Sequence, residues 1–324
     1  MKRLISLLLC ALLIVPALAE DAPDFEPIPW DIKVSPNLPN PDCYLPNNGG
    51  YHDDSIDIQI NVTYWTQDLQ QVDAPGEGTT TVMSARVKLT DVSQFRTGFA
   101  NKYPSKQARH VNDMTKRFKA VMGIDGDYCL YHEQGIVVRN GQTLRMRPHK
   151  GRDELIVDEN GDFHLITCTT QAKWDEYIAG GGTVLHAFCF GPALVVDGVP
   201  LTNLDDVTID NGKAKKAQRM VIGQIGKLEY LILTNEGPES TAPKSVGFDL
   251  VQMANLCVQF GLNNAYNLDG GSSSTIALNN QKINSPSSHK NRMVGDCIWF
   301  ATLVKEETWR EEESVQTVEV EENK

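Results

Sequence analysis

Residues 266–275, of sequence YNLDGGSSST, change abruptly from an apolar run to one carboxylate, two glycines and a series of hydroxyl side chains. Adjacent glycines let backbone N–H groups approach an anion or a sugar hydroxyl. Asp269 adds a carboxylate that can serve as an acid, a base, a nucleophile or an acceptor for a sugar hydroxyl. The structural alternative is a serine-rich hairpin loop in which Asp269 caps a turn.

A second apolar segment also ends on carboxylates, because residues 120–129 read AVMGIDGDYC. Strand geometry places side chains two positions apart on the same face, so we expect Asp125 and Asp127 to point into one site. We name Asp269, Asp125 and Asp127 as candidate catalytic residues. A carboxylate pair also suits a divalent cation. We expect no required cofactor, with a divalent cation as the alternative and its ligands unknown.

Two arginines stand at the entrances of predicted strands, Arg219 before residues 220–225 and Arg292 before residues 296–304. A guanidinium fork matches the oxygens of a phosphate, whereas a structural salt bridge is the alternative for each. Asn267 alternates onto the same strand face as Asp269. The candidate substrate and phosphate contacts are therefore Arg219, Arg292, Asn267, Gly270, Gly271, Ser272 and Ser273.

The elements around these residues follow from periodicity. Residues 247–261 place apolar side chains at helical spacing, and residues 276–278 form a short apolar strand that ends at an Asn-Asn turn. The expected order around Asp269 is therefore helix, glycine turn, buried strand, glycine loop and strand.

The rest of the chain predicts many short strands. Alternation at residues 56–60 and 81–89 indicates a hairpin, and Asn-Gly turns at 140–141 and 160–161 indicate two more. We expect residues 92–118 to be mainly helical and residues 174–178 to form a short helix. Without regular βαβ alternation, this pattern predicts an α+β fold with mixed, largely antiparallel sheets, a few packed helices and a single main domain.

The two ends of the chain differ in composition from the main domain between them. Residues 1–19 combine Met-Lys-Arg, an apolar run and Ala-Leu-Ala, which predicts a signal peptide cleaved after Ala19 and a secreted or extracytoplasmic protein. Residues 20–50 are rich in proline and asparagine and suggest an extended leader or linker. Residues 51–304 form the main domain, and 305–324 an acidic C-terminal tail.

Composition narrows the choice of partners. The formal net charge is −12, and no basic cluster offsets it, so nucleic acid is a poor partner. Beyond the signal peptide no apolar segment approaches the roughly 20 residues of a membrane span. Most of the six cysteines after residue 19 lie in apolar segments, which favours free, buried thiols over disulfides, with one disulfide as the alternative.

The order of several motifs is more specific than any one of them. IDGDY at 124–128, FGPALVVDG at 190–198, RMVIG at 219–223 and NLDGGSSST at 267–275 are followed by an arginine before the last strand. This succession, over residues 80–304, resembles the phosphodiester glycosidase family. The chain departs from the usual pattern in having Asp125 at an asparagine position and Ser272 where a third glycine is common.

The resemblance implies an exported hydrolase that cleaves the sugar–phosphate bond of a glycosyl phosphodiester in a surface or extracellular glycan, such as an exopolysaccharide. Its partner is then a carbohydrate phosphodiester substrate. Two alternatives remain open from the sequence: a non-catalytic carbohydrate-binding module, and a metal-dependent phosphodiesterase that uses Asp125 and Asp127.

Overall fold

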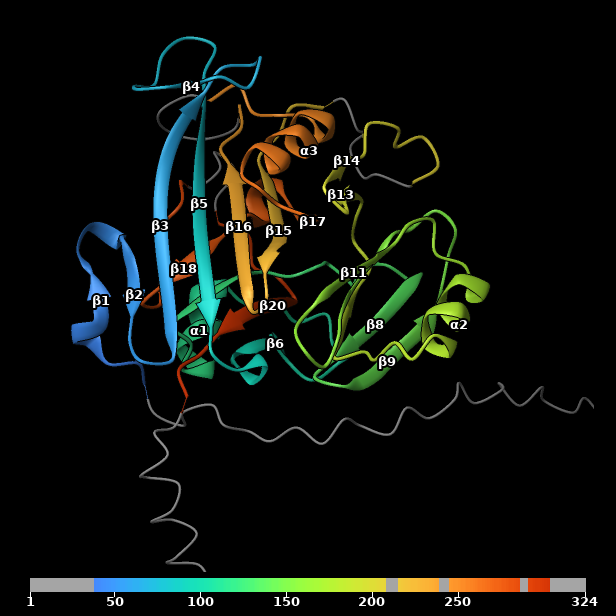
Figure 1. Ribbon diagram of the computed structural model, residues 1–324. Helices are drawn as coiled ribbons and strands as arrows, with labels where there is room; N and C mark the ends of the chain where they lie inside the picture. Colours follow the sequence, from blue (N-terminus) through green and yellow to red (C-terminus); the bar gives the residue numbers. More distant parts are fainter. Residues whose placement is uncertain (1–37, 208–214, 239–244, 286–290, 304–324) are drawn as a thin grey trace, which may run out of the picture.

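The computed structural model describes residues 38–207, 215–238, 245–285 and 291–303. The predicted signal peptide and the acidic tail lie outside the described residues. Within them, three antiparallel sheets are combined with three α-helices, so the predicted α+β class holds in a strand-dominated form (Figure 1).

The first sheet is the largest and runs through the centre of the molecule (Figure 1). In spatial order its strands are β1 (Tyr44–Leu45), β2 (Gly50–His52), β3 (Ile56–Trp65), β5 (Thr80–Leu89), β16 (Glu229–Asn235), β15 (Arg219–Gly226), β17 (Asn264–Leu268), β13 (Ala193–Val196) and β14 (Val199–Pro200), with β4 (Gln71–Val72) paired to β3. The predicted hairpin of β3 and β5 is confirmed, with Ile58 opposite Val87.

Two smaller sheets complete the strand content. The second contains β11 (Phe163–Ile166), β10 (Glu154–Val157), β12 (His186–Phe188), β8 (Gly135–Arg139) and β9 (Gln142–Arg147). The third contains β19 (Gln281–Lys282), β18 (Ile276–Leu278), β7 (Met122–Asp125), β20 (Asp296–Phe300) and β6 (Phe95–Phe99). The predicted Asn140-Gly141 turn joins β8 to β9, with positive φ at both residues, as a tight two-residue hairpin requires.

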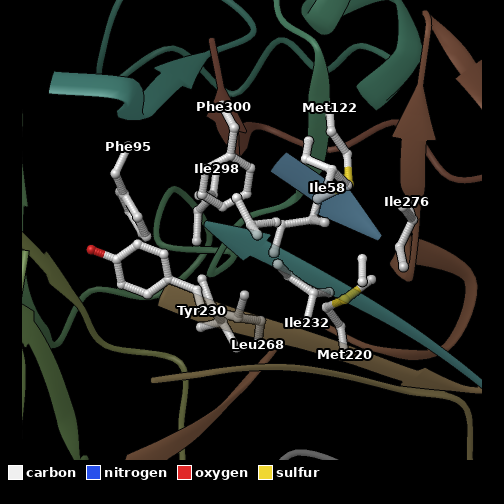
Figure 2. Close-up of a cluster of buried hydrophobic side chains, with 14 of the residues drawn as sticks. Ile58, Phe95, Met122, Met220, Tyr230, Ile232, Leu268, Ile276, Ile298 and Phe300 are labelled. Carbon is white, nitrogen blue, oxygen red and sulfur yellow. The ribbon is translucent and has the colours of Figure 1, made fainter. Parts of the chain in front are cut away.

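The main hydrophobic core fills the space between the first and third sheets. Figure 2 shows Met122, Ile298 and Phe300 of the third sheet facing Ile58 and Ile232 of the first. All of these side chains are at most 2% exposed. Removal of this apolar surface from water stabilises the fold, at about 25 cal/mol for each Å² buried.

The helices cover the outer faces of the sheets. They are α1 (Val111–Phe118), α2 (Gln171–Ala179) and α3 (Leu250–Gln259). The predicted helix before Asp269 is thereby confirmed as α3, which starts with a capping box between Asp249 and Gln252 and packs its apolar side on the first sheet. The short predicted helix near Trp174 is confirmed as α2, which packs on the second sheet.

Two predictions of local structure are wrong. Residues 92–118 are helical only in α1 and in the 3-10 turn η3 (Val92–Gln94), because β6 lies between them. Phe95 and Thr97 alternate inward and β6 adds to the edge of the third sheet beside β20, so packing prevails over the polar composition. The extended leader predicted for residues 20–50 also ends earlier than expected, because regular structure begins at Pro41.

The last part of that leader forms regular structure. The 3-10 turns η1 (Pro41–Cys43) and η2 (Pro46–Asn48) flank β1, and β1 pairs with β2 at the edge of the first sheet. Prolines open both turns, since the first helical position needs no backbone donor. The remaining 3-10 turn, η4 (Gly271–Ser273), lies in the glycine loop after β17.

The cysteines and the helices of the described residues bear on two further predictions. The six cysteines in this part of the chain, at positions 43, 129, 168, 189, 257 and 297, are free, as the apolar surroundings predicted. No helix in the described ranges is long and apolar enough to cross a membrane.

Candidate active site

A cavity of about 290 Å³ opens where β17 ends and β15 begins. These strands are antiparallel neighbours, with Leu268 opposite Met220, so the residues after β17 meet those before β15. Most of the predicted site residues line this cavity: Asn267, Asp269, Gly270, Gly271, Ser272, Arg219 and Arg292. Of the other predicted residues, Asp125, Asp127 and Ser273 do not line the cavity.

Among the described residues that line the cavity, Asp269 is the only one with a carboxylate. The side chain directly follows β17, and the residue is only 8% exposed. Its Oδ1 accepts the N–H of Gly270 at 2.9 Å, while its own N–H donates to the carbonyl of Gly126 at 3.3 Å. Asp269 is thus held by the backbone on both sides, which fixes its carboxylate at the cavity wall.

Asp125 lies fully buried at the end of β7, close enough to Asp269 for the two charges to interact. Its Oδ1 accepts the N–H of Thr275 at 2.8 Å. Burial, followed by the charge of Asp269, raises the pKa of Asp125 well above its ordinary value. Burial and the neighbouring charge of Asp269 thus both favour the protonated form of Asp125.

Asp127 occupies a different environment, so the expectation that Asp125 and Asp127 share a site is wrong. The carboxylate of Asp127 lies 2.8 Å from the Nη2 of Arg139 and accepts the N–H groups of Cys129 and Cys189. Burial alone would raise the pKa of Asp127, but the charge of Arg139 and these hydrogen bonds hold it below its ordinary value.

The two carboxylates diverge because the strand does not continue. β7 ends at Asp125, and Gly126 packs so closely that an added Cβ would lie 2.4 Å from the carboxyl group of Asp296. Asp296 is the second carboxylate on Arg139, at 3.2 Å, and burial raises its pKa to about 7. The cluster of Asp127, Cys129 and Asp296 is compact enough for a metal ion, but Arg139 already occupies it.

Arg219 presents a buried cation to the cavity. The residue is 7% exposed, its Nη2 donates to the carbonyl of Lys215 at 2.6 Å, and its buried Nε has no hydrogen-bond partner among the described residues. Burial lowers the pKa of Arg219 to about 10, which the charge of Asp249 partly offsets. The group remains charged at neutral pH, and an anion in the cavity would compensate its desolvation.

Arg292 and Arg152 add further positive charge. Arg292 is exposed, and its guanidinium lies 4.8 Å from the centre of the Tyr128 ring. Arg152 is 6% exposed and donates to the carbonyl of Phe190 at 3.1 Å. Arg152, Tyr128 and Phe190 also line the cavity and were not among the predicted site residues; the last two lie inside quoted motifs, whereas no local pattern pointed to Arg152.

The glycine loop contributes less to anion binding than predicted. The N–H of Gly270 is used by Asp269, and the N–H of Gly271 donates to the carbonyl of Gln218 at 2.8 Å. Gly271 has φ +60°, which favours glycine and turns the chain into η4. Ser272 lines the cavity, whereas Ser273 is fully buried and does not line it. Arginines, rather than loop amides, are the main anion-binding groups.

Asn267 is placed as predicted. The side chain is 2% exposed at the cavity, and its Nδ2 donates to the carbonyl of Gly191 at 2.8 Å. Its Oδ1 has no hydrogen-bond partner among the described residues. An oxygen held in this way can accept a hydrogen bond from a sugar hydroxyl.

Comparisons with known proteins show to which family the chain is similar. The family described as phosphodiester glycosidase matches residues 118–301, more than half of the chain and all of the residues above. The catalytic domain of zebrafish N-acetylglucosamine-1-phosphodiester alpha-N-acetylglucosaminidase is similar in structure, with a TM-score of 0.61, 15% identity, and coverage of 78% of this chain and 86% of that chain.

A hypothetical protein from Synechocystis is also similar, with a TM-score of 0.51, 14% identity, and coverage of 77% of this chain and 62% of that chain. At such identities the likeness shows the fold alone. A search of the curated proteins gave no match. Because the family match spans the strands and loops that build the cavity, this chain belongs to the phosphodiester glycosidase family.

Proposed function

We propose that this protein hydrolyses the bond between a sugar and a phosphate in a glycosyl phosphodiester. The observation that carries the proposal is the pairing, in one cavity, of a single carboxylate, Asp269, with the desolvated cation of Arg219. Family membership supports the same reaction class.

The chemistry suits this charge distribution. The leaving group is a phosphate monoester, whose second pKa is about 6, so it departs more easily than an alcohol and chiefly needs compensation of its charge. Arg219 and Arg292 supply that charge, and a guanidinium donates two parallel hydrogen bonds to phosphate oxygens. This places the phosphate at the arginine side of the cavity.

The sugar then lies against Asp269. Glycoside cleavage passes through an oxocarbenium-like transition state, which a nearby carboxylate stabilises. Burial favours the protonated form of Asp125, so in this proposal Asp269 is the member of the pair that bears the negative charge beside the anomeric carbon. Asn267 accepts a hydrogen bond from a sugar hydroxyl through its Oδ1.

We further propose that the enzyme is exported by the predicted signal peptide and acts on a surface or extracellular glycan. The motif order and the apolar start of the chain support this. The related zebrafish enzyme acts, by its name, on an N-acetylglucosamine-1-phosphodiester, so N-acetylglucosamine is the first sugar to test.

The experiment is a product assay on a panel of glycosyl phosphodiesters with purified protein. Release of free sugar and phosphate monoester, lost in Asp269→Asn, is the expected result. Tight binding without turnover across the panel would instead favour a carbohydrate-binding module. A P–O cleavage that requires added metal would favour a phosphodiesterase, although Asp127 is already bound by Arg139.

A further inference from the structure

A second, more open pocket of about 570 Å³ adjoins the candidate active site. His132 lines this second pocket, and its Nδ1 lies 3.1 Å from the Nη2 of Arg152. The His132 ring is also 6.1 Å from the ring of Phe190. Since Arg152 and Phe190 line the active-site cavity, the two hollows share this wall.

A stack of cations and rings runs from one hollow to the other. The guanidinium of Arg292 lies over the Tyr128 ring, and the Tyr128 and Tyr131 rings are stacked with centres 4.4 Å apart and planes 24° apart. The ammonium of Lys106, which lines the second pocket, lies 5.8 Å from the centre of the Tyr131 ring. The rings thereby hold a cation at each end of the stack, Arg292 at the active-site cavity and Lys106 at the second pocket.

The loop that carries the two tyrosines is built rigidly. Tyr128 has φ +57°, an unusual value for a bulky residue, and the N–H of Tyr131 donates to its carbonyl at 3.0 Å. Arg145 holds the same loop by donating to the carbonyls of Cys129 and Gln134, each at 2.8 Å. Strained, over-determined loops of this kind occur preferentially at binding sites, and a preformed surface reduces the entropy lost on binding.

The second pocket also gathers positive charge in an acidic protein. Its lining includes Lys106, Arg145 and Arg147 against one carboxylate, Glu133, whereas the whole chain has a formal net charge of −12. No ion pair among the described residues involves Lys106 or Arg147. Their charges are therefore available to an anion.

We propose that the cations of the second pocket, with Lys106 held by the Tyr128–Tyr131 stack, bind a further phosphate group of the substrate, one unit beyond the phosphate at Arg219. The preferred substrate is then a polyanionic chain with repeated phosphodiesters, rather than a single glycosyl phosphodiester. The proposal deepens the function proposed above and rests on it for the reaction, but the binding can be measured without turnover.

The binding test uses probes that contain no glycosidic bond. Calorimetry compares a glycerol phosphate oligomer with four phosphates to methyl glycerol phosphate, which has one. We expect the oligomer to bind about tenfold tighter than the single diester, corresponding to one or two charge-assisted contacts. This excess should disappear in the double variant Lys106→Ala, Arg147→Ala, and shrink at 0.5 M salt.

Matched variants test whether the excess affinity comes from the second pocket or from positive charge on the protein surface in general. Lys102→Ala removes an exposed cation from the segment of Lys106 without touching the pocket, and it should retain the full excess. Tyr131→Phe should retain most of the excess and Tyr131→Leu should lose part of it, because the aromatic ring holds the ammonium of Lys106 at the pocket. Equal affinities for the two probes in the unaltered protein, or an excess that survives in the double variant, would overturn the proposal.

A kinetic comparison separates this proposal from the proposed function. With N-acetylglucosaminyl phosphodiesters that carry one or two phosphates, the double variant should lose about tenfold in kcat/KM on the longer substrate only, through KM. If the enzyme cleaves both substrates equally well, the function stands and the second phosphate site fails. If neither is cleaved while the calorimetric excess persists, the binding site stands and the function fails.

Discussion

The carboxyl group of Asp125 is fully buried beside Asp269, and the charge of Asp269 adds to burial in raising the pKa of Asp125. Neighbouring carboxylates disfavour each other's ionisation. Burial and the charge of Asp269 therefore both favour the neutral form of Asp125, whereas Asp269 lies at the wall of the cavity. This asymmetry gives the two residues different roles.

The substitution Asp125→Asn should become more stabilising as the pH rises. The folded pKa of Asp125 lies above its unfolded value, so the folded state binds more protons, and the contribution of Asp125 to stability falls as the pH rises above about 4. An asparagine remains neutral and retains an Oδ1 for the N–H of Thr275. The measurement is Tm of both proteins at pH 5 and pH 8.

We expect the Tm of the variant, relative to the unaltered protein, to be higher at pH 8 than at pH 5. Lys282 is the cation that acts on Asp125 and opposes the shift, so Lys282→Met should steepen the pH dependence of the unaltered protein. A pH-independent difference between Asp125→Asn and the unaltered protein would show that Asp125 is ionised in the fold.

Asp127→Asn, in contrast to Asp125→Asn, should destabilise the protein at neutral pH. Removal of this carboxylate leaves the buried guanidinium of Arg139 with Asp296 alone, and breaking a buried ion pair costs about 3–5 kcal/mol. Denaturant unfolding at pH 7 measures the loss. A change below about 1 kcal/mol would mean that Asp296 compensates fully for the missing charge.

The sequence predicted the location of the site better than the roles of its members. Asp269 and Asn267, predicted from strand alternation, and Arg219, predicted from its place at a strand entrance, line one cavity, because β17 and β15 are adjacent and these residues stand at the ends that meet. Local patterns of this kind are determined by a few neighbouring residues, so a single sequence carries them.

The features that the sequence did not predict depend on packing between segments that are distant along the chain. The separation of Asp127 from Asp125 depends on Asp296, which is far along the chain and packs against Gly126. The strand β6 depends on β20 as a neighbour, and its polar sequence alone suggested a helix. Arg152 reaches the cavity through loops whose course no local pattern encodes.

Arg219 should be more sensitive to substitution than an ordinary surface arginine. Arg219→Lys keeps the charge but loses the bidentate fork, and we expect kcat/KM to fall by about 10- to 100-fold, since a charge-assisted hydrogen bond contributes about 1.5–3 kcal/mol. Steady-state kinetics on a glycosyl phosphodiester measures the change. Arg86→Ala, at an exposed ion pair with Glu229, is the control and should stay within twofold.

Chelation should leave the reaction unchanged. Asp127 and Asp296 are bound by Arg139, and Asp125 lies at the other side of Gly126, so the carboxylates do not form a shared ligand set. We expect kcat to stay within twofold after dialysis against EDTA. A loss of activity that Ca²⁺ or Mn²⁺ restores would contradict this prediction and would indicate that the carboxylates bind a metal ion.

Asp269→Asn should abolish sugar release while the fold persists. The replacement is isosteric, and its Oδ1 can still accept the N–H of Gly270, so Tm should change by no more than a few degrees. Loss of the negative charge removes stabilisation of the oxocarbenium-like transition state, and we expect kcat to fall at least about 10³-fold, equivalent to roughly 4 kcal/mol. Full activity in this variant would contradict the proposed role of Asp269.

The most direct test of the central claim is hydrolysis in water enriched in ¹⁸O, followed by mass spectrometry of both products. If Asp269 and the arginines promote cleavage between the sugar and the phosphate oxygen, the label enters the free sugar and the phosphate monoester remains unlabelled. Label in the phosphate would show cleavage of the P–O bond and would contradict the account.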